Sequence, residues 1–217
     1  MVRRADLTLE YLLRERGFAR IAGLDEAGRG AWAGPVVAGA VILPLDRFDL
    51  AHVLEGVTDS KQLKAEQREA LLPRILDVAA GAAVGHASHA EIDQLGIVPA
   101  TRLAMRRALD ALAVAPDVLL SDALALPGIR LPCHAVVKGD QRSLSIAAAS
   151  ILAKVTRDQL MIDLDPAFPQ YGFAVHKGYG TPLHQQSLAH FGPTELHRMS
   201  FAPLQAVLAE YDGDPRR

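Results

Sequence analysis

Carboxylate side chains end three apolar runs of the sequence. Asp25 and Glu26 follow IAGL, Asp122 follows VLLS, and Asp140 follows VVKG. A buried anion costs free energy unless a cation or hydrogen-bond donors compensate for it, and Mg²⁺ prefers carboxylate and water ligands. Two divalent ions about 4 Å apart can activate water and stabilise the leaving oxygen in phosphodiester hydrolysis. The recurrence therefore indicates metal-dependent phosphodiester cleavage, although any one of these carboxylates, taken alone, fits a turn or a helix cap better than a metal site.

The first two carboxylates, Asp25 and Glu26, are consecutive. Because consecutive side chains of a strand point to opposite faces, both reach one metal cluster only if the strand ends, bulges or twists there. The segment AGRGAWAG that follows is rich in glycine, which favours such a change of backbone direction. We therefore expect the strand to be irregular at this position.

Other polar residues fit less specific roles. Asp158 lies four residues after Lys154 in a predicted helix, so an ion pair between them is the simpler interpretation. The histidines of the last third lack the HExxH spacing of a zinc site, which favours packing or surface positions: His176, His184, His190 and His197. The glycine run does not match a dinucleotide-binding fingerprint, and neither a Walker A lysine nor a GxSxG elbow occurs.

Hydrophobic periodicity predicts the elements that position the carboxylates. Strands are expected at 21–26, 35–43, 82–87, 117–122 and 133–137. Helices are expected at 7–14, 65–80, 145–161, 182–190 and after 201. The segment 92–113 is expected to form two helices that separate near 96–99. Segments 58–63 and 171–180 are expected to be loops. The first two strands are joined by a short turn, which predicts an antiparallel pair. Alternating strands and helices indicate an α/β sheet covered by helices, and the alanines of SIAAAS would let one helix pack closely.

Length and composition favour one domain that spans residues 1–217, with a sheet-containing core at about 18–165 and a helical region at about 166–217. The single cysteine, Cys133, excludes an intramolecular disulfide and suits the cytoplasm. Because the charged N-terminus lacks a long apolar core, we expect neither a signal peptide nor a membrane partner.

The formal net charge of −2 is unusual for a protein that binds nucleic acid. Local potential matters more than the total, and cations do cluster near the motifs: Lys61, Lys138, Arg142, Lys154, Arg157 and Lys177.

Longer motifs, in order, resemble the ribonuclease HII family. They are GLDEAGRGAWAGPVVAGAV, DSKQL, IDQLGI followed by ATRLAMRRAL, KGDQRSLSIAAASILAKVTRD, HKGYGTPLH and HRMSFAP, within about residues 20–203. The resemblance implies a ribonuclease H-like α/β fold, with a mixed five-stranded sheet flanked by helices and a C-terminal helical region. It implies an endoribonuclease that uses two Mg²⁺ or Mn²⁺ ions and acts on RNA–DNA hybrids and on ribonucleotides embedded in duplex DNA. We expect the protein to be a monomer. The cut lies 5′ of the ribonucleotide, leaves 3′-hydroxyl and 5′-phosphate ends, and starts ribonucleotide removal.

The resemblance also assigns the site residues. Catalytic and metal-binding roles fall to Asp25, Glu26, Asp122 and Asp140, with Asp25 bridging both ions. Substrate-binding roles fall to Gly28, Arg29 and Gly30 at the ribose 2′-hydroxyl and to Tyr179 against the deoxyribose next to the junction. Apart from the resemblance, Lys61 and Lys177 lie in predicted polar loops, positions that suit phosphate contacts. Taken alone, the glycines could form a hairpin turn, the tyrosine could pack and the lysines could be solvated.

One departure and two rivals bear on this interpretation. Ala123 follows Asp122, where the family commonly has glycine, so the local turn is in question. The sister family ribonuclease HIII normally carries an N-terminal DNA-binding domain and a glutamate as third carboxylate, neither of which is expected here. A non-catalytic module that binds hybrids is disfavoured because it has no need for four carboxylates facing phosphates.

Overall fold

The computed structural model describes residues 5–212 of the 217-residue chain, and for 210–212 it describes the backbone alone. Its strands are β1 (Ile21–Ala27), β2 (Val36–Ile42), β3 (Gly81–Ala87), β4 (Val118–Asp122) and β5 (Cys133–Val136). Its α-helices are α1 (Thr8–Glu15), α2 (Leu50–Val53), α3 (Ala65–Val78), α4 (His89–Leu95), α5 (Ile97–Asp110), α6 (Leu144–Leu164), α7 (Phe173–His176), α8 (Pro182–Phe191) and α9 (Ala202–Asp212). Short 3₁₀ helices are η1 (Ser60–Gln62), η2 (Gly139–Gln141) and η3 (Asp165–Ala167).

The predicted strands are all present and form one five-stranded sheet in the order β3-β2-β1-β4-β5. β1 and β2 pair antiparallel, as predicted, and β2 pairs antiparallel with β3. β4 runs parallel to both β1 and β5. The sheet is therefore mixed, and the C-terminal ends of β1 and β4 lie at the same edge.

Two segments predicted to be loops contain helical turns, because hydrophobic periodicity does not detect elements this short. η1 lies within 58–63, and α7 lies within 171–180. The predicted break near 96–99 falls at Gly96, which has φ of +81°, so Pro99 belongs to the first turn of α5, where proline is tolerated.

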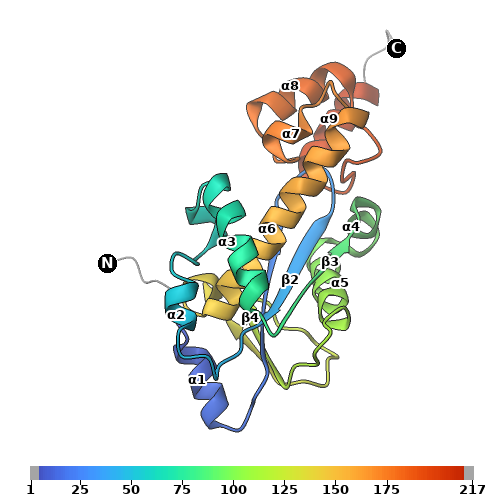
Figure 1. Cartoon of the computed structure of the whole chain (residues 1–217). Helices are drawn as coiled ribbons and strands as arrows, with labels where there is room; N and C mark the ends of the chain where they lie inside the picture. Colours follow the sequence, from blue (N-terminus) through green and yellow to red (C-terminus); the bar gives the residue numbers. More distant parts are fainter. Residues whose placement is uncertain (1–4, 213–217) are drawn as a thin grey trace.

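Helices cover both faces of the sheet (Figure 1). α6 packs along β1 and β2 on one face, and α5 packs on β2 and β3 on the other. A Cβ at Gly23 would lie 2.2 Å from the Ser145 carbonyl carbon, and one at Gly39 would lie 2.4 Å from the Ala149 carbonyl oxygen. Only glycine allows the backbone of α6 to approach this closely. The close approach expected from the alanine-rich helix is thus confirmed.

The C-terminal helical region is also present. α6 extends beyond the sheet, and α7, α8 and α9 gather around its far end (Figure 1). These helices share a small apolar cluster made of Ala33, Met161, Tyr171, Phe173, Leu188 and Leu204. Ala33 comes from the segment between β1 and β2, so that segment connects the sheet to the helical region. No helix among residues 5–212 is long and apolar enough to cross a membrane.

Candidate metal and nucleic-acid site

Three aspartates converge at one edge of the sheet. The parallel register pairs Leu24 of β1 with Ser121 of β4, which places Asp25 and Asp122 at adjacent positions one residue further along. Asp140 lies in η2, which follows β5. One carboxylate oxygen from each aspartate lies within 4.8 Å of the others. The structure therefore brings together three of the four predicted ligands.

The charges of this group are poorly compensated. Burial, together with the charges of Glu26 and Asp122, raises the pKa of Asp25 well above its ordinary value. Burial and the charges of Asp122 and Asp59 raise the pKa of Asp140 to about 6. The Oδ2 atom of Asp25 is buried without a hydrogen-bond partner in the described part of the chain. Hard oxygen donors with this excess of negative charge fit a divalent cation such as Mg²⁺ or Mn²⁺.

Glu26 lies near this group but is not among the three residues whose carboxylate oxygens lie within 4.8 Å of one another. β1 keeps a regular register here, with Asp25 opposite Gly39 and Glu26 opposite Ala38. The pairing with β2 therefore has no bulge, whereas the pairing with β4 ends at Leu24. The charge of Glu26 still acts on Asp25, and that of Asp122 acts on Glu26. Arg29 Nη1 donates to Glu26 Oε1 at 3.2 Å, while the buried Oε2 atom has no partner among the described residues.

Asp59 connects two segments that flank the aspartates. It accepts hydrogen bonds from Lys61 N at 2.9 Å and, across the site, from Gln141 Nε2 at 3.2 Å. Burial opposes the charge of Lys61, but the carboxylates around it outweigh burial and raise its pKa. Lys61 is therefore placed beside the acidic group. Sequence reasoning missed Asp59 and Gln141, although both lie in the motifs DSKQL and KGDQ.

The two predicted glycines between β1 and β2 differ in their surroundings. Gly28 has φ of +95°, and a Cβ there would lie 1.9 Å from Arg157 Nε. Gly30 is exposed, and no described atom outside its chain neighbours lies within 4 Å of the Cβ position. Between them, the Arg29 carbonyl accepts a hydrogen bond from Arg198 Nη1 at 2.9 Å. Packing against Arg157 therefore requires glycine at position 28, whereas position 30 has room for a larger side chain.

Arg157 corrects one expectation about the basic residues. It is fully buried rather than exposed to phosphates. Its guanidinium donates to the carbonyls of Pro35 at 2.9 Å, Lys177 at 2.9 Å and Ala33 at 3.1 Å. The sequence pattern predicts a surface cation at this position because it does not show which face of α6 meets the segment between β1 and β2.

The expected ion pair on α6 is present. Lys154 Nζ lies 2.6 Å from Asp158 Oδ1, so Asp158 is not a competitor of Asp140 for the metal.

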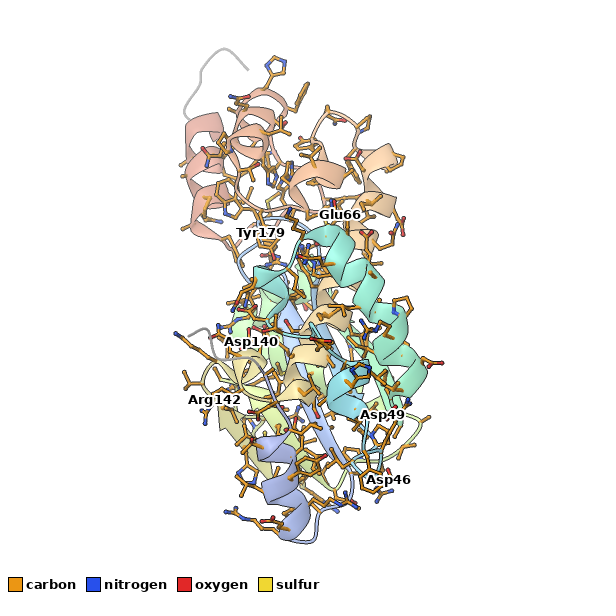
Figure 2. The ribbon with its side chains drawn as sticks, turned by 60° about the vertical axis from the view of Figure 1, so that its left-hand side comes forward. Asp46, Asp49, Glu66, Asp140, Arg142 and Tyr179 are labelled. Carbon is orange, nitrogen blue, oxygen red and sulfur yellow. The ribbon has the colours of Figure 1, made fainter. Side chains whose placement is uncertain are left out.

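Tyr179 and Lys177 lie in the C-terminal region. In Figure 2, Tyr179 is at the end of that region nearest the sheet, above Asp140. Its ring centroid is 5.3 Å from Lys154 Nζ and 5.2 Å from Arg157 Cζ. Lys177 has φ of +52°, and its ammonium donates to the Ala174 carbonyl. Tyr179 thus lies in the C-terminal region beside α6 and is not one of the residues of the aspartate group.

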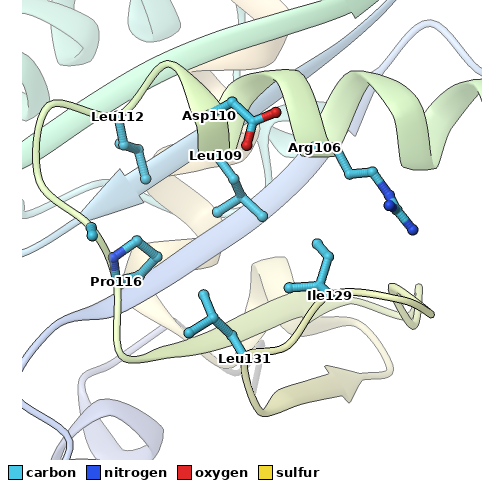
Figure 3. Close-up of a pocket in the computed structure, with 8 residues that line it drawn as sticks. Arg106, Leu109, Asp110, Leu112, Pro116, Ile129 and Leu131 are labelled. Atoms are coloured by element: carbon cyan, nitrogen blue, oxygen red, sulfur yellow. The ribbon is translucent and has the colours of Figure 1, made fainter.

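A separate hollow lies between the end of α5 and the segment 115–131 (Figure 3). It is lined mainly by apolar side chains, among them Leu109, Leu112, Pro116, Ile129 and Leu131. Pro116 precedes β4, whereas Asp122 ends it. The hollow is thus at the opposite end of the strand from the aspartates and is not part of their site.

A mixed sheet in the order β3-β2-β1-β4-β5, with an aspartate group at the ends of its central parallel strands, defines an enzyme of the ribonuclease H-like class. The chain belongs to the ribonuclease HII family, since the family model described as Ribonuclease HII matches residues 22–204. It is therefore a ribonuclease H, a family of endonucleases that use divalent metal ions.

Curated relatives and solved structures agree with this assignment. Ribonuclease HII of Chloroflexus aurantiacus is 56% identical over 205 residues, which cover 94% of this chain and 97% of the relative. That of Roseiflexus castenholzii is 55% identical and covers 87% of this chain and 84% of the relative. The crystal structure of ribonuclease H2 from Pyrococcus horikoshii has a TM-score of 0.75 and 25% identity, and the match covers 90% of this chain and all of that chain.

A ribonuclease HIII structure solved with Mn²⁺, titled Bst-RNase HIII, shares the fold, with a TM-score of 0.71 at 22% identity. The match covers 91% of this chain but 71% of that one.

Proposed function

We propose that this enzyme hydrolyses RNA in RNA–DNA hybrids and cuts duplex DNA at embedded ribonucleotides, on the 5′ side of the ribonucleotide, leaving 3′-hydroxyl and 5′-phosphate ends. The observation that carries the proposal is the convergence of carboxylate oxygens from Asp25, Asp122 and Asp140 within 4.8 Å. Family membership supports the choice of substrate.

Asp25, Asp122 and Asp140 would hold two divalent ions, Mg²⁺ or Mn²⁺, with Glu26 as the fourth ligand. When bound, such ions lower the pKa of a coordinated water and stabilise the charge that develops on the leaving oxygen. The chain keeps the ligands in place: the Gly139 N–H donates to Asp122 Oδ1 at 2.7 Å and orients that carboxylate.

Recognition of the substrate falls to residues on both sides of the aspartates. Gly30 is exposed and has no side chain, so the backbone of Gly28–Gly30 can approach a ribose 2′-hydroxyl, the group that separates RNA from DNA. Tyr179 is partly exposed and would stack on the deoxyribose that follows the junction. Lys61 and Lys177 would contact phosphates. We take the enzyme to act as a monomer.

The test compares the wild type with Asp122→Asn on duplex DNA that carries one ribonucleotide, with Mg²⁺ or Mn²⁺. Asp110→Asn is the matched control, because Asp110 is exposed at the end of α5. We expect the wild type and the control to cut, and Asp122→Asn to be slower by at least about 100-fold, since a lost metal ligand removes several kcal/mol of transition-state stabilisation. All-DNA duplex should remain intact.

Two outcomes would overturn the proposal. If the wild type binds the hybrid without cutting it, the chain is a binding module. If Asp122→Asn cuts as fast as the control, the aspartates do not carry the chemistry.

A further inference from the structure

Three buried histidines pack together in the C-terminal region. We call His176, His184 and His197 the histidine cluster. The rings of His176 and His184 are stacked with centroids 4.3 Å apart, and His184 Nε2 lies 3.0 Å from His197 Nε2. The mechanism above uses none of them, yet they bracket the segment that carries Tyr179.

The partners of the first two rings define where their protons lie. The Gly178 N–H donates to His176 Nδ1 at 3.1 Å, so that nitrogen is an acceptor and His176 Nε2–H donates to the Tyr171 carbonyl at 2.7 Å. His184 Nδ1 lies 3.1 Å from the Tyr179 carbonyl, which can only accept, so this nitrogen carries a proton. In a neutral ring the Nε2 atom of His184 is then an acceptor.

The third ring completes this arrangement. The Thr194 N–H donates to His197 Nδ1 at 2.8 Å, which leaves the His197 proton on Nε2, where it donates to His184 Nε2. One arrangement of protons therefore satisfies all six ring nitrogens with every imidazole neutral. A proton added to His184 would place two N–H groups face to face. Burial and the charges of neighbouring histidines lower the pKa of His184 to about 4, and burial foremost does the same for His197.

We propose that the histidine cluster positions Tyr179 for stacking on the substrate. His176 holds the Gly178 N–H, His184 holds the Tyr179 carbonyl, and His197 fixes the tautomer with which His184 can donate. This inference rests on the proposed function, because the role of the cluster depends on Tyr179 stacking on the deoxyribose of the substrate. The same segment is also tied to the segment between β1 and β2 by the bond from Trp32 N to the Gly178 carbonyl at 2.7 Å.

The first experiment determines the charge and tautomer of each histidine ring by ¹⁵N NMR of the whole protein at neutral pH. We expect neutral rings, with the proton on Nδ1 in His184 and on Nε2 in His176 and His197. A charged His184, or one with its proton on Nε2, would overturn the inference. This readout does not depend on cleavage, so it separates a failure of the inference from a failure of the proposed function, in which the wild type would not cut.

The second measurement compares two replacements of His184. Asparagine places an amide N–H near the Nδ1 position and can still donate to the Tyr179 carbonyl, whereas glutamine reaches the Nε2 position and cannot. We expect His184→Gln to lower kcat/KM on a single embedded ribonucleotide by about 3- to 10-fold, as for one lost hydrogen bond, and His184→Asn to lower it less. His190→Gln, an exposed position on the same helix, is the control and should have no effect.

A double-mutant cycle with Tyr179→Ala separates positioning from general destabilisation. If the cluster acts through Tyr179, His184→Gln should cause no further loss in the Tyr179→Ala background. An equal loss in both backgrounds would mean that the histidines only pack. Should His184→Gln fail to fold, His197→Asn serves instead: it keeps an acceptor for the Thr194 N–H, removes the donor to His184, and is expected to show the same dependence on Tyr179.

Discussion

Asp25, Asp122 and Asp140 carry the same functional group but depend on different neighbours. Asp25 is buried under α6 and accepts a hydrogen bond from Glu26 N at 2.7 Å. Asp122 is oriented by the Gly139 N–H, and Asp140 lies within reach of the charges of Asp59 and Lys61. Asp122 and Asp140 are thus influenced by groups from other segments, whereas Asp25 is bonded by its own chain neighbour, and this difference cannot be inferred from the carboxylates alone.

Ala123 adopts a left-handed backbone with φ of +50°, directly after Asp122. Ala123 therefore adopts a backbone conformation that suits glycine, which costs an alanine roughly 1–2 kcal/mol. Because Ala123 is exposed, Ala123→Gly loses no packing. We expect it to raise the free energy of unfolding by about 0.5–1 kcal/mol once the larger entropy of unfolded glycine is counted.

Urea unfolding measures this effect, with Ala125→Gly as control. Ala125 is also exposed but does not have a positive φ, so its replacement should destabilise the protein. Equal destabilisation by both variants would show that residue 123 is not strained.

Gly28→Ala and Gly30→Ala should differ in what they damage. Gly28→Ala forces a Cβ to 1.9 Å from Arg157 Nε at a positive φ, so we expect it to lower the free energy of unfolding by more than about 1–2 kcal/mol. Gly30→Ala meets open space, so stability should hold while cleavage at a ribonucleotide falls about tenfold, equivalent to 1.4 kcal/mol. Thermal unfolding and kcat/KM separate the two. Full activity of Gly30→Ala would show that the backbone of Gly30 does not take part in recognition of the 2′-hydroxyl.

Helix α1 is linked to the start of α6 by one buried carboxylate. Glu10 Oε1 accepts from Ser143 Oγ at 2.6 Å and from Ser145 N at 2.9 Å. An anion near the first turn of a helix is favoured by the helix dipole. Burial nevertheless raises the pKa of Glu10, and its Oε2 atom lacks a partner among the described residues. α6 is thereby capped from another element, and α6 in turn packs against the strand that carries Asp25.

The pKa of Glu10 predicts how stability depends on pH. Because the folded pKa lies above the ordinary value of 4.5, the folded protein keeps a proton that the unfolded chain releases. The free energy of unfolding therefore falls as pH rises from 4.5 through the folded pKa. Glu10→Gln does not titrate, so its stability relative to the wild type should increase over this range and then level off.

Urea unfolding at a series of pH values tests this expectation. Glu10→Ala should cost about 1–3 kcal/mol, since the Ser145 N–H loses its partner. Glu15→Gln, at the exposed end of α1, is the control. The range from pH 4 to 7 spans the ordinary pKa of 4.5. A constant difference between Glu10→Gln and the wild type across this range would contradict a raised pKa.

The sheet and the C-terminal region are joined through two buried arginines. Arg157 binds carbonyls of both the segment between β1 and β2 and the segment before Tyr179. Arg198 donates to the carbonyls of Gly34 at 3.0 Å and Arg29 at 2.9 Å, and burial lowers its pKa to about 9. The Gly28–Gly30 backbone is proposed to contact the ribose and Tyr179 the deoxyribose on either side of the RNA–DNA junction. The two buried arginines therefore connect the segments that carry these two groups.

Arg198→Lys should loosen this connection, because a single ammonium cannot span both carbonyls as a planar guanidinium does. We expect faster amide hydrogen exchange in residues 28–35 and a loss of about 3- to 10-fold in cleavage, as for one hydrogen bond. Arg102→Lys is the control, since Arg102 donates to a single carbonyl, that of Ala125, on α5's side of the sheet. Unchanged exchange in residues 28–35 would show that Arg198 is not their anchor.

Local patterns in the sequence were enough to predict the strands, most helices, the antiparallel pair and the carboxylates that end apolar runs. These features depend on neighbouring residues, because alternation and helical spacing arise within one element. The quoted motifs likewise identified the family, which the comparisons confirm.

Contacts between segments distant in the sequence decide which of these residues lie close together. The order of the strands brought Asp25 beside Asp122, and Glu26 lies outside the group of three aspartates. Burial of Arg157, the different needs of Gly28 and Gly30, and the partners of His184 likewise depend on packing between α6, the segment before β2 and the C-terminal helices. Local periodicity carries no information about strand order or about which helix face meets which segment, and these depend on the packing of the complete chain.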